Sequence, residues 1–227
     1  MKLSVIVPVY NERRTIELIL AKVRAVDVEK EIIVVDGASI NGTRELLKKQ
    51  EAHPGTRVIY QERRNGRGGA LKEGIAAATG DLVIFQDADL EVDPADYPAL
   101  LKPIEDGAAQ VVFGSRFLAG KPIMTPLQYL GNRILTSAVN LLYGSRLTDV
   151  ETCYQVFPRQ VLQGMRINSN DFAFTVELTV KLLKAGYAIK EIPIRYIPRG
   201  RAEGKKIYWA DGFASLYTLI KYRFFNS

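Results

Sequence analysis

The chain has 227 residues, of which 47% are hydrophobic and 25% are charged. This balance is typical of a globular protein, and the length suits one α/β domain with a sizeable core. The formal net charge is +6, from 31 Lys and Arg against 25 Asp and Glu. A positive balance favours an anionic partner, such as a phosphorylated metabolite, an acidic lipid or nucleic acid.

Cysteine and histidine are nearly absent, and this restricts the kinds of active site that the chain can build. Cys153 is the single cysteine, so no disulfide can form within the chain, and a reducing, cytoplasmic compartment is expected. His53 is the single histidine, and we expect it in a surface loop because it lies in the turn-like stretch 52–55. No apolar run approaches the ~18 residues that a membrane span needs.

The first half of the chain alternates the patterns of strands and helices. Apolar runs predict buried strands, and helical spacing of apolar residues predicts helices. The strands are expected at 3–9, 31–35, 57–61 and 82–85, and the helices at 15–26, 43–50 and 68–78. Continuously apolar strands that alternate with helices indicate a parallel sheet with helices on both faces. Ligands of such sheets bind beyond the carboxyl ends of the strands, so site residues should directly follow strands.

The second half is less regular. Strands are expected at 111–113, 154–157 and 189–197, and helices at 127–143, at 172–185 and from about Asp211. An apolar stripe of the 127–143 helix is formed by Leu127, Leu130, Ile134, Ala138 and Leu141. The aromatic tail 208–225 is also amphipathic, and both segments suit either a membrane interface or core packing. With no repeat and no linker-like tract, residues 1–227 are expected to form one domain.

The stretch from Phe85 to Glu91 is the most informative for chemistry. A buried strand leads directly into three carboxylates, Asp87, Asp89 and Glu91. Burying several carboxylates together is costly unless a cation neutralises them. Oxygen ligands suit Mg²⁺ or Mn²⁺, which keep positions open for phosphate oxygens. A solvated acidic loop is the alternative, but the position at the end of a buried strand favours a metal site.

Three motifs follow strands in the order and at the spacing of a known family. They are Val-Pro-Val-Tyr-Asn-Glu at 7–12, Val-Val-Asp at 34–36 and Asp-Ala-Asp at 87–89. Together they resemble the family 2 glycosyltransferases of the GT-A fold, which have a Rossmann-like sheet covered by helices on both faces. The resemblance implies that Asp89 ligates the metal on a sugar nucleotide, assisted by Asp87 and Glu91. It also implies that the nucleotide is bound by Pro8, Tyr10, Glu12 and Asp36. Gly37 departs from the family pattern, since many relatives carry a second Asp there.

The expected acceptor side carries a second resemblance. Arg116 follows a strand in Gly-Ser-Arg, and Arg133, Ser137 and Asn140 share one ridge of the 127–143 helix by their spacing. This pattern resembles the polyprenyl-phosphate hexose synthases, a subfamily that includes dolichol-phosphate mannose synthase. The resemblance implies that Arg116, Arg133 and Ser137 hold the lipid phosphate, and that Arg116 acts in catalysis beside Asp87 and Asp89. On the residues alone, an ordinary amphipathic core helix is equally compatible.

Residues 195–206 form a basic segment with Pro198, Gly200 and Gly204, which we expect to be a loop. Cationic loops over active sites can clamp phosphates and exclude water. The subfamily has a basic loop at this place, which implies that Arg199, Arg201 and Lys206 bind the nucleotide sugar. A solvated loop or a membrane-surface patch is the alternative.

The expected reaction needs no general base. A phosphate monoester has its second pKa near ~6, so at neutral pH it is largely dianionic and can attack the anomeric carbon of a sugar directly. The resemblance implies an inverting, Mg²⁺- or Mn²⁺-dependent transfer of a hexose from a donor of the GDP-mannose or UDP-glucose type. The acceptor would be a dolichyl or undecaprenyl phosphate at the cytoplasmic face of a membrane, with the enzyme bound peripherally, alone or through an anchor subunit.

Three alternatives stay open on the sequence. A glycan hydroxyl acceptor would need a general base, for which Asp149 or Glu151 is suitably placed. A sugar-nucleotide pyrophosphorylase would carry a Gly-rich basic loop where this chain has Pro-Val-Tyr-Asn-Glu. A catalytically silent subunit that recruits a membrane partner fits poorly with the intact Asp87 and Asp89. Nucleic-acid binding has no supporting motif.

Overall fold

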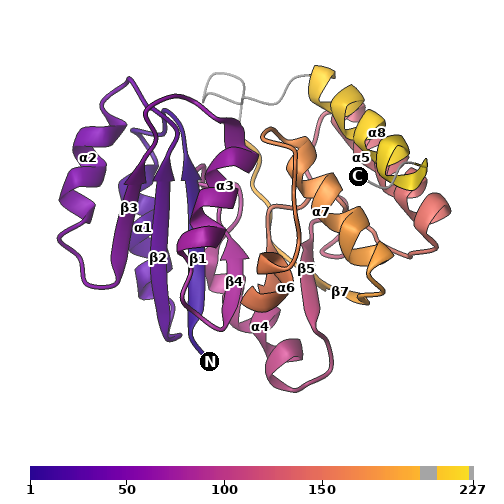
Figure 1. Ribbon diagram of the computed structural model, residues 1–227, viewed down its shortest axis with the longest axis horizontal. Coiled ribbons are helices and arrows are strands. Elements are labelled where there is room, and N and C mark those ends of the chain that lie inside the picture. Colours follow the sequence, from indigo (N-terminus) through magenta and orange to yellow (C-terminus); the bar gives the residue numbers. More distant parts are fainter. Residues whose placement is uncertain (200–208, 225–227) are drawn as a thin grey trace.

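A computed structural model of the chain describes residues 1–199 and 209–224, with the side chains of the last helix from residue 217 onward. The strands are β1 (Leu3–Val9), β2 (Lys30–Asp36), β3 (Thr56–Tyr60), β4 (Leu82–Phe85), β5 (Val111–Ser115), β6 (Gln155–Pro158) and β7 (Ile189–Pro193). They form one sheet in the order β3-β2-β1-β4-β6-β5-β7. Figure 1 shows this sheet with helices on both faces, which confirms the expected α/β architecture.

The helices lie between the strands and at the end of the chain. They are α1 (Ile16–Ala25), α2 (Thr43–Gln50), α3 (Gly66–Ala77), the short 3₁₀ helix η1 (Pro94–Asp96), α4 (Tyr97–Glu105), α5 (Pro126–Tyr143), α6 (Arg159–Gln163), α7 (Ala173–Lys184) and α8 (Trp209–Phe224). The sequence-based assignments of the first half agree with the structure to within two residues. The main difference in the second half is the strand expected at 189–197, which ends at Pro193, opposite Ser115 at the end of its partner β5.

Strand direction decides which residues reach the functional edge of the sheet. β1 is parallel to β2 and β4, and β5 is parallel to β7. Because β4 and β5 both pair antiparallel with β6, they run in the same direction, and the carboxyl ends of all five strands lie on one edge. β6 is antiparallel to both of its neighbours, which the sequence did not predict. Its reversed direction brings the residues before it, 149–154, to the same edge as the carboxyl ends of β4 and β5.

Each face of the sheet has its own hydrophobic core. Val5 and Val7 of β1 pack with α1 and α4 on one face, whereas Ile6 faces α3, α6 and α7 on the other. This alternation is the period-two pattern of a strand that is buried on both sides. At Gly74 of α3 a Cβ atom would collide with the side chain of Ile6, so glycine is needed for the close approach of α3 to β1.

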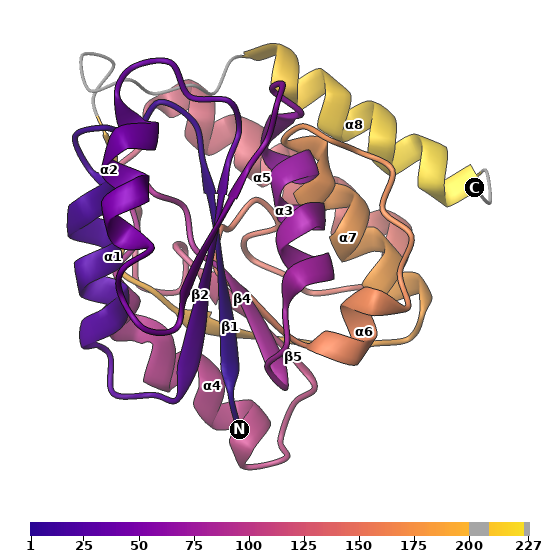
Figure 2. The ribbon, with the colours of Figure 1, turned by 60° about the vertical axis from the view of Figure 1, so that its left-hand side comes forward.

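A third core lies beside the sheet rather than on it. Val139 of α5, Val176 of α7 and Leu219 of α8 are fully buried in one cluster. Figure 2 shows α8 lying along α7 and close to α5 at the outer side of the molecule. The C-terminal helix is therefore part of the packed fold, and it extends the layer that α7 begins.

Glu177 is a carboxylate buried within α7. Its oxygens accept hydrogen bonds from the backbone N–H groups of Asn168 and Ser169 and from Lys181 Nζ, each at 2.8 Å. Burial favours the neutral acid, but these donors outweigh burial and lower the pKa of Glu177 from 4.5 to about 2. The ionised carboxylate thus fastens the loop before α7 to the helix.

Replacing Glu177 with Gln should destabilise the protein by about 2–4 kcal/mol at neutral pH, because the amide NH₂ would face N–H donors and Lys181 would lose its counter-ion. The lowered folded-state pKa makes this contribution complete above about pH 4.5 and progressively smaller as the pH falls towards 2. Urea unfolding of both proteins between pH 7 and pH 3 measures the effect. The exposed Glu105→Gln is the control, and a Glu177→Gln deficit that does not shrink in acid would contradict the assignment.

Candidate active site

A pocket opens at the carboxyl edge of the sheet, between the ends of β1, β4 and β5 and the residues that precede β6. Eight of the predicted site residues line it: Pro8, Tyr10, Glu12, Asp87, Asp89, Glu91, Arg116 and Arg199. Asp36, Arg133 and Ser137 are not among the lining residues. Arg201 and Lys206 lie outside the described residues.

The loops that follow β1, β2 and β4 share an unusual backbone feature. Each contains one non-glycine residue with a left-handed conformation, at Asn11 (φ 56°), Ala38 (φ 61°) and Leu90 (φ 65°). Such positions cost on the order of 1–3 kcal/mol each and cluster at functional sites. Leu90 turns the chain between Asp89 and Glu91. Ala38 and Leu90 could not be recognised from the sequence, because alanine and leucine have no preference for the left-handed region.

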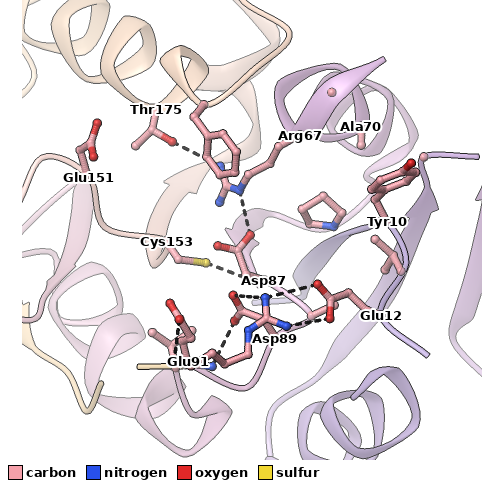
Figure 3. A pocket seen from close by; sticks show the side chains of 18 of the residues that line it. Tyr10, Glu12, Arg67, Ala70, Asp87, Asp89, Glu91, Glu151, Cys153 and Thr175 are labelled. Atoms are coloured by element: carbon pink, nitrogen blue, oxygen red, sulfur yellow. Dashed lines mark hydrogen bonds and ion pairs between the residues drawn. The ribbon is translucent and has the colours of Figure 1, made fainter. Parts of the chain in front are cut away.

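Arginines already compensate both aspartates of the Asp-Ala-Asp motif. Arg67 Nε donates to Asp87 Oδ1 at 2.8 Å, and Arg199 Nη2 donates to Asp89 Oδ2 at 3.2 Å (Figure 3). Glu91 accepts from the backbone N–H of Arg199 at 2.9 Å and from the Tyr196 hydroxyl at 3.2 Å. The predicted carboxylates therefore converge on the pocket, each with a donor against it.

Asp89 is the carboxylate whose ionisation is most disfavoured. Its burial, together with the nearby charges of Asp87 and Glu91, raises the pKa of Asp89 to about 7, although Arg199 acts in the opposite direction. A cation at this point would relieve the same penalty, which fits a metal-binding role. Among the described residues, however, no three Asp, Glu, His or Cys side chains surround a common point. The arrangement fits a Mg²⁺ or Mn²⁺ ion that takes one or two carboxylates here and its other ligands from phosphate oxygens and water.

Asp36 lies behind the pocket lining, one residue before Gly37. It is fully buried, and its Oδ2 accepts from Arg44 Nε at 2.6 Å and from the Ser39 backbone at 3.2 Å. Gly37, the next residue, lines the pocket instead. The direct contact of Asp36 with a nucleotide stays a prediction. On the pocket surface the Arg64 guanidinium lies over the Tyr10 ring, 4.4 Å from its centroid.

Arg116 is the most firmly held cation of the pocket. Its Nε and Nη2 atoms donate to the two oxygens of Asp149, both at 2.7 Å, and its side chain is 13% exposed. Burial alone would lower the pKa of Arg116, but the carboxylate beside it raises the pKa above the ordinary value, so the charge is permanent. Asp149 is fully buried and bound to Arg116, so it cannot reach a substrate as a general base. Glu151 lines the pocket, so it is the residue of this pair that could act as a general base.

Asp149 is itself held by β7. Glu191 accepts from the backbone N–H groups of Thr148 and Asp149, at 2.8 and 3.0 Å, and from the Thr148 hydroxyl at 2.9 Å. The Ser115 hydroxyl lies 2.6 Å from that of Thr148. A continuous set of hydrogen bonds thus runs from β7 to Arg116.

The predicted ridge of α5 divides into two parts. Asn140 is occupied with the turn after the helix, where it bonds both the N–H and the C=O of Leu147 at 2.8 Å. Arg133 and Ser137 are exposed, and the Arg133 guanidinium lies 5.8 Å from the centre of the Phe117 ring. Their role toward an acceptor phosphate stays a prediction. Asn132, which the sequence analysis missed, accepts from Arg116 Nη2 at 3.1 Å and so connects α5 to the pocket.

The apolar stripe of α5 faces outward. The buried face of the helix carries Leu135, Thr136 and Val139. Four of the five stripe residues are largely exposed: Leu127 (73%), Leu130, Ile134 and Leu141 (85%). Ordinary core packing therefore does not explain them. No helix among the described residues is long and apolar enough to cross a membrane.

Arg67 and Cys153 are pocket residues that sequence reasoning did not assign. Arg67 lies in Asn65–Ala70, a stretch whose glycines could serve either anion binding or close packing; Gly68 leaves no room for a Cβ beside Phe174, which supports packing. Cys153 Sγ accepts from the Asp87 backbone N–H at 3.2 Å. Burial raises the pKa of the Cys153 thiol, which keeps it protonated and unsuited to act as a nucleophile.

Comparison with known sequences identifies relatives over most of the chain. The family model described as glycosyl transferase family 2 matches residues 4–165. Glycosyltransferase AglJ of Haloferax volcanii is 30% identical over 197 residues, which cover 86% of this chain and 63% of AglJ. The undecaprenyl-phosphate mannosyltransferase of Micrococcus luteus is 29% identical over 218 residues, which cover 90% of this chain and 87% of that protein. This chain thus spans less than two thirds of AglJ.

A solved structure shares the fold along the whole chain. Glucosyl-3-phosphoglycerate synthase from Mycobacterium tuberculosis, crystallised with Mn²⁺, uridine diphosphate and phosphoglyceric acid, has a TM-score of 0.77 and 23% sequence identity. The match covers 100% of this chain and 80% of the synthase. At this identity it shows the fold alone, and it confirms the GT-A architecture expected from the sequence.

The buried pair of Arg116 and Asp149 should contribute strongly to stability. Asp149→Ala leaves a buried guanidinium without its counter-ion, and we expect a loss of about 3–5 kcal/mol in the free energy of unfolding. Urea denaturation measures it. Asp106→Ala, which breaks the exposed pair with Lys102, is the control and should cost less than about 1 kcal/mol. If the two substitutions lowered the free energy of unfolding equally, the stabilising role of the buried Arg116–Asp149 ion pair would be contradicted.

Proposed function

The chain belongs to glycosyl transferase family 2 and is a glycosyltransferase, and we propose that it transfers a hexose from a nucleotide diphosphate sugar to a polyprenyl phosphate. The observation that carries this proposal is the buried, permanently charged Arg116. It lies in the same pocket as Asp87 and Asp89 and is bonded through Asn132 to a helix with an exposed apolar face. A cation fixed between a diphosphate site and an apolar surface suits an acceptor that has a phosphate head and a hydrocarbon tail.

The relatives support the same class of acceptor. The mannosyltransferase of Micrococcus luteus is named for transfer to undecaprenyl phosphate, and the similarity covers 90% of this chain. Acceptor binding is proposed for Arg116, Arg133 and Ser137. On the donor side, Pro8, Tyr10 and Glu12 would contact the nucleotide, with Asp36 behind them and Arg199 beside the diphosphate. Arg201 and Lys206 are proposed to contribute there as well.

The chemistry requires positioning more than proton transfer. A dianionic acceptor phosphate can attack the anomeric carbon in line, with inversion at that carbon, so the protein has to align two phosphates and stabilise the leaving diphosphate. Asp89, with Asp87 or Glu91, would hold a Mg²⁺ or Mn²⁺ ion, which supplies charge neutralisation of the diphosphate. Arg116 would hold the attacking phosphate, and Asp149 fixes the orientation of its guanidinium.

A hydroxyl acceptor is the second candidate, and the position of Glu151 favours it. Of the two residues considered as a general base, Asp149 is fully buried against Arg116, whereas Glu151 lines the pocket. Transfer to a hydroxyl would need such a base, whereas transfer to a phosphate would not.

We place the protein at the cytoplasmic surface of a membrane through α5. Beside the exposed apolar stripe, residues 107–148 contain no Asp or Glu, and their charged residues are Arg116, Lys121, Arg133 and Arg146. An apolar face on a segment whose charged residues are all cations suits an anionic lipid surface. Tyr217, Ile220 and Phe224 of α8 are exposed as well and would extend this face.

The transfer reaction can be tested with labelled UDP-glucose and GDP-mannose, a short polyprenyl phosphate, and Mg²⁺ or Mn²⁺. The wild type should form a labelled lipid phosphate sugar with one of the donors. Asp89→Ala should lower kcat/KM by roughly 100-fold or more, because charge stabilisation of the leaving group is lost. Asp106→Ala should behave as the wild type, and an Asp89→Ala protein that keeps full activity would contradict the metal assignment.

Glu151→Gln separates the two acceptor classes in the same assay. With a phosphate acceptor its rate should stay within about tenfold of the wild type, since no base is required. A loss of roughly 10²–10⁴-fold, accompanied by wild-type transfer to a sugar hydroxyl, would favour the second candidate instead.

Membrane attachment can be tested by co-sedimentation with phosphatidylserine vesicles. The double substitution Leu130→Ser and Ile134→Ser should weaken binding at least roughly tenfold, because each apolar side chain contributes about 1.5–3 kcal/mol when it leaves water. The control is Leu18→Ser with Ile40→Ser, which removes exposed apolar side chains elsewhere. Binding should also weaken as salt rises. Unchanged binding of the α5 variant would contradict its role as the docking face.

A further inference from the structure

Arg199 bridges two carboxylates that belong to different loops. Its Nη1 donates to Glu12 Oε2 at 2.9 Å, and its Nη2 donates to Glu12 Oε1 at 3.3 Å and to Asp89 Oδ2 at 3.2 Å. Its backbone N–H bonds Glu91 as well. The Arg199 side chain is 14% exposed and lines the pocket, so its charge lies next to Asp89, the carboxylate assigned to the metal. Figure 3 shows Glu12, Asp89 and Glu91 around this point.

One donor of this guanidinium has no partner in the part of the chain that the structure describes. Arg199 Nε is buried, and no acceptor among the described residues bonds it. An arginine that is fully committed to a structural role would have a partner for each buried N–H group, because an unpaired buried donor costs about 1–3 kcal/mol. The Nε–H group of Arg199 can therefore donate a hydrogen bond to a ligand, next to the place where a diphosphate would lie.

We propose that Arg199 is the resident counter-ion of Asp89 and competes with the divalent metal for it, so that metal and nucleotide diphosphate bind together rather than metal first. This inference rests on the proposed function and deepens it. A divalent ion at Asp89 must displace the guanidinium and would then face a neighbouring positive charge. A diphosphate resolves both difficulties, because it ligates the metal and offers Arg199 an anion for bidentate hydrogen bonds.

The competition has a thermodynamic consequence. If the diphosphate draws Arg199 away from Asp89, the nucleotide strengthens metal binding, and the metal must strengthen nucleotide binding by the same factor. Removing the guanidinium should raise the affinity for metal alone and reduce this coupling. Arg67 bonds Asp87 and not Asp89, so a substitution of Arg199 leaves this second pair in place.

The test is Mn²⁺ binding to the intact chain, followed by electron paramagnetic resonance, with Mn²⁺ alone and with Mn²⁺ plus UDP or GDP. The proteins are the wild type, Arg199→Gln, Arg199→Lys and the control Arg195→Gln. The control removes an equal charge from an exposed position four residues away. We expect Arg199→Gln to bind Mn²⁺ alone roughly tenfold more tightly than the wild type, and the difference to shrink when nucleotide is present. Arg199→Lys, which cannot bridge Glu12 and Asp89 in the same way, should be intermediate.

The outcomes separate this inference from the proposed function. Equal Mn²⁺ affinity of the wild type and both Arg199 variants, or weaker binding by the variants, would overturn the competition. Tighter binding by Arg195→Gln as well would also overturn it, since the effect would then be one of net charge. If the wild type bound no Mn²⁺ even in the presence of UDP or GDP, that result would instead contradict the metal-dependent transfer reaction of the proposed function. Thermal unfolding of each variant shows that the compared proteins are folded.

Discussion

Burial of carboxylates at the end of β4 is the constraint around which the pocket is organised. The short strand delivers Asp87 and Asp89 to a place where water cannot fully solvate them, and burial raises the pKa of Asp89. Arg67 at the start of α3 and Arg199 beyond β7 offset this cost. Arg67 comes from the helix directly before β4, whereas Arg199 lies 110 residues beyond Asp89, so the ion pairs of one loop connect the two halves of the chain.

The sequence predicted the parts of this arrangement that depend on local pattern. Apolar runs located the strands, and the residues directly after β1, β4 and β5 proved to line one pocket. It could not predict that Asp149 would be buried against Arg116, because that depends on the antiparallel β6 and on Glu191 of β7. The spacing of apolar residues could not decide which face of α5 is buried either, because the stripe through Leu130 and Ile134 is equally compatible with core packing and with an exposed interface.

The outward stripe and the inward Asn132 give α5 two distinct contacts. Asn132 accepts from Arg116, while the exposed side chains of Leu130 and Ile134 lie within two residues of it along the same helix. A rise of 1.5 Å per residue keeps these groups within a few ångströms along the helix axis. An apolar surface that takes up this stripe would therefore set the depth of Arg116 relative to that surface, and with it the place of an acceptor phosphate.

The two pocket arginines that are proposed to bind phosphates, Arg116 and Arg199, differ in how they are held, and this difference matches their proposed roles. Asp149, the partner of Arg116, is completely buried, so a ligand cannot replace it and the guanidinium stays in one orientation. The partners of Arg199 are Glu12 and Asp89, both of which line the pocket, where an incoming anion or cation can exchange with them. A fixed cation suits the nucleophile, whose position decides the line of attack. An exchangeable cation suits the leaving diphosphate, which has to enter with its metal and depart in every cycle.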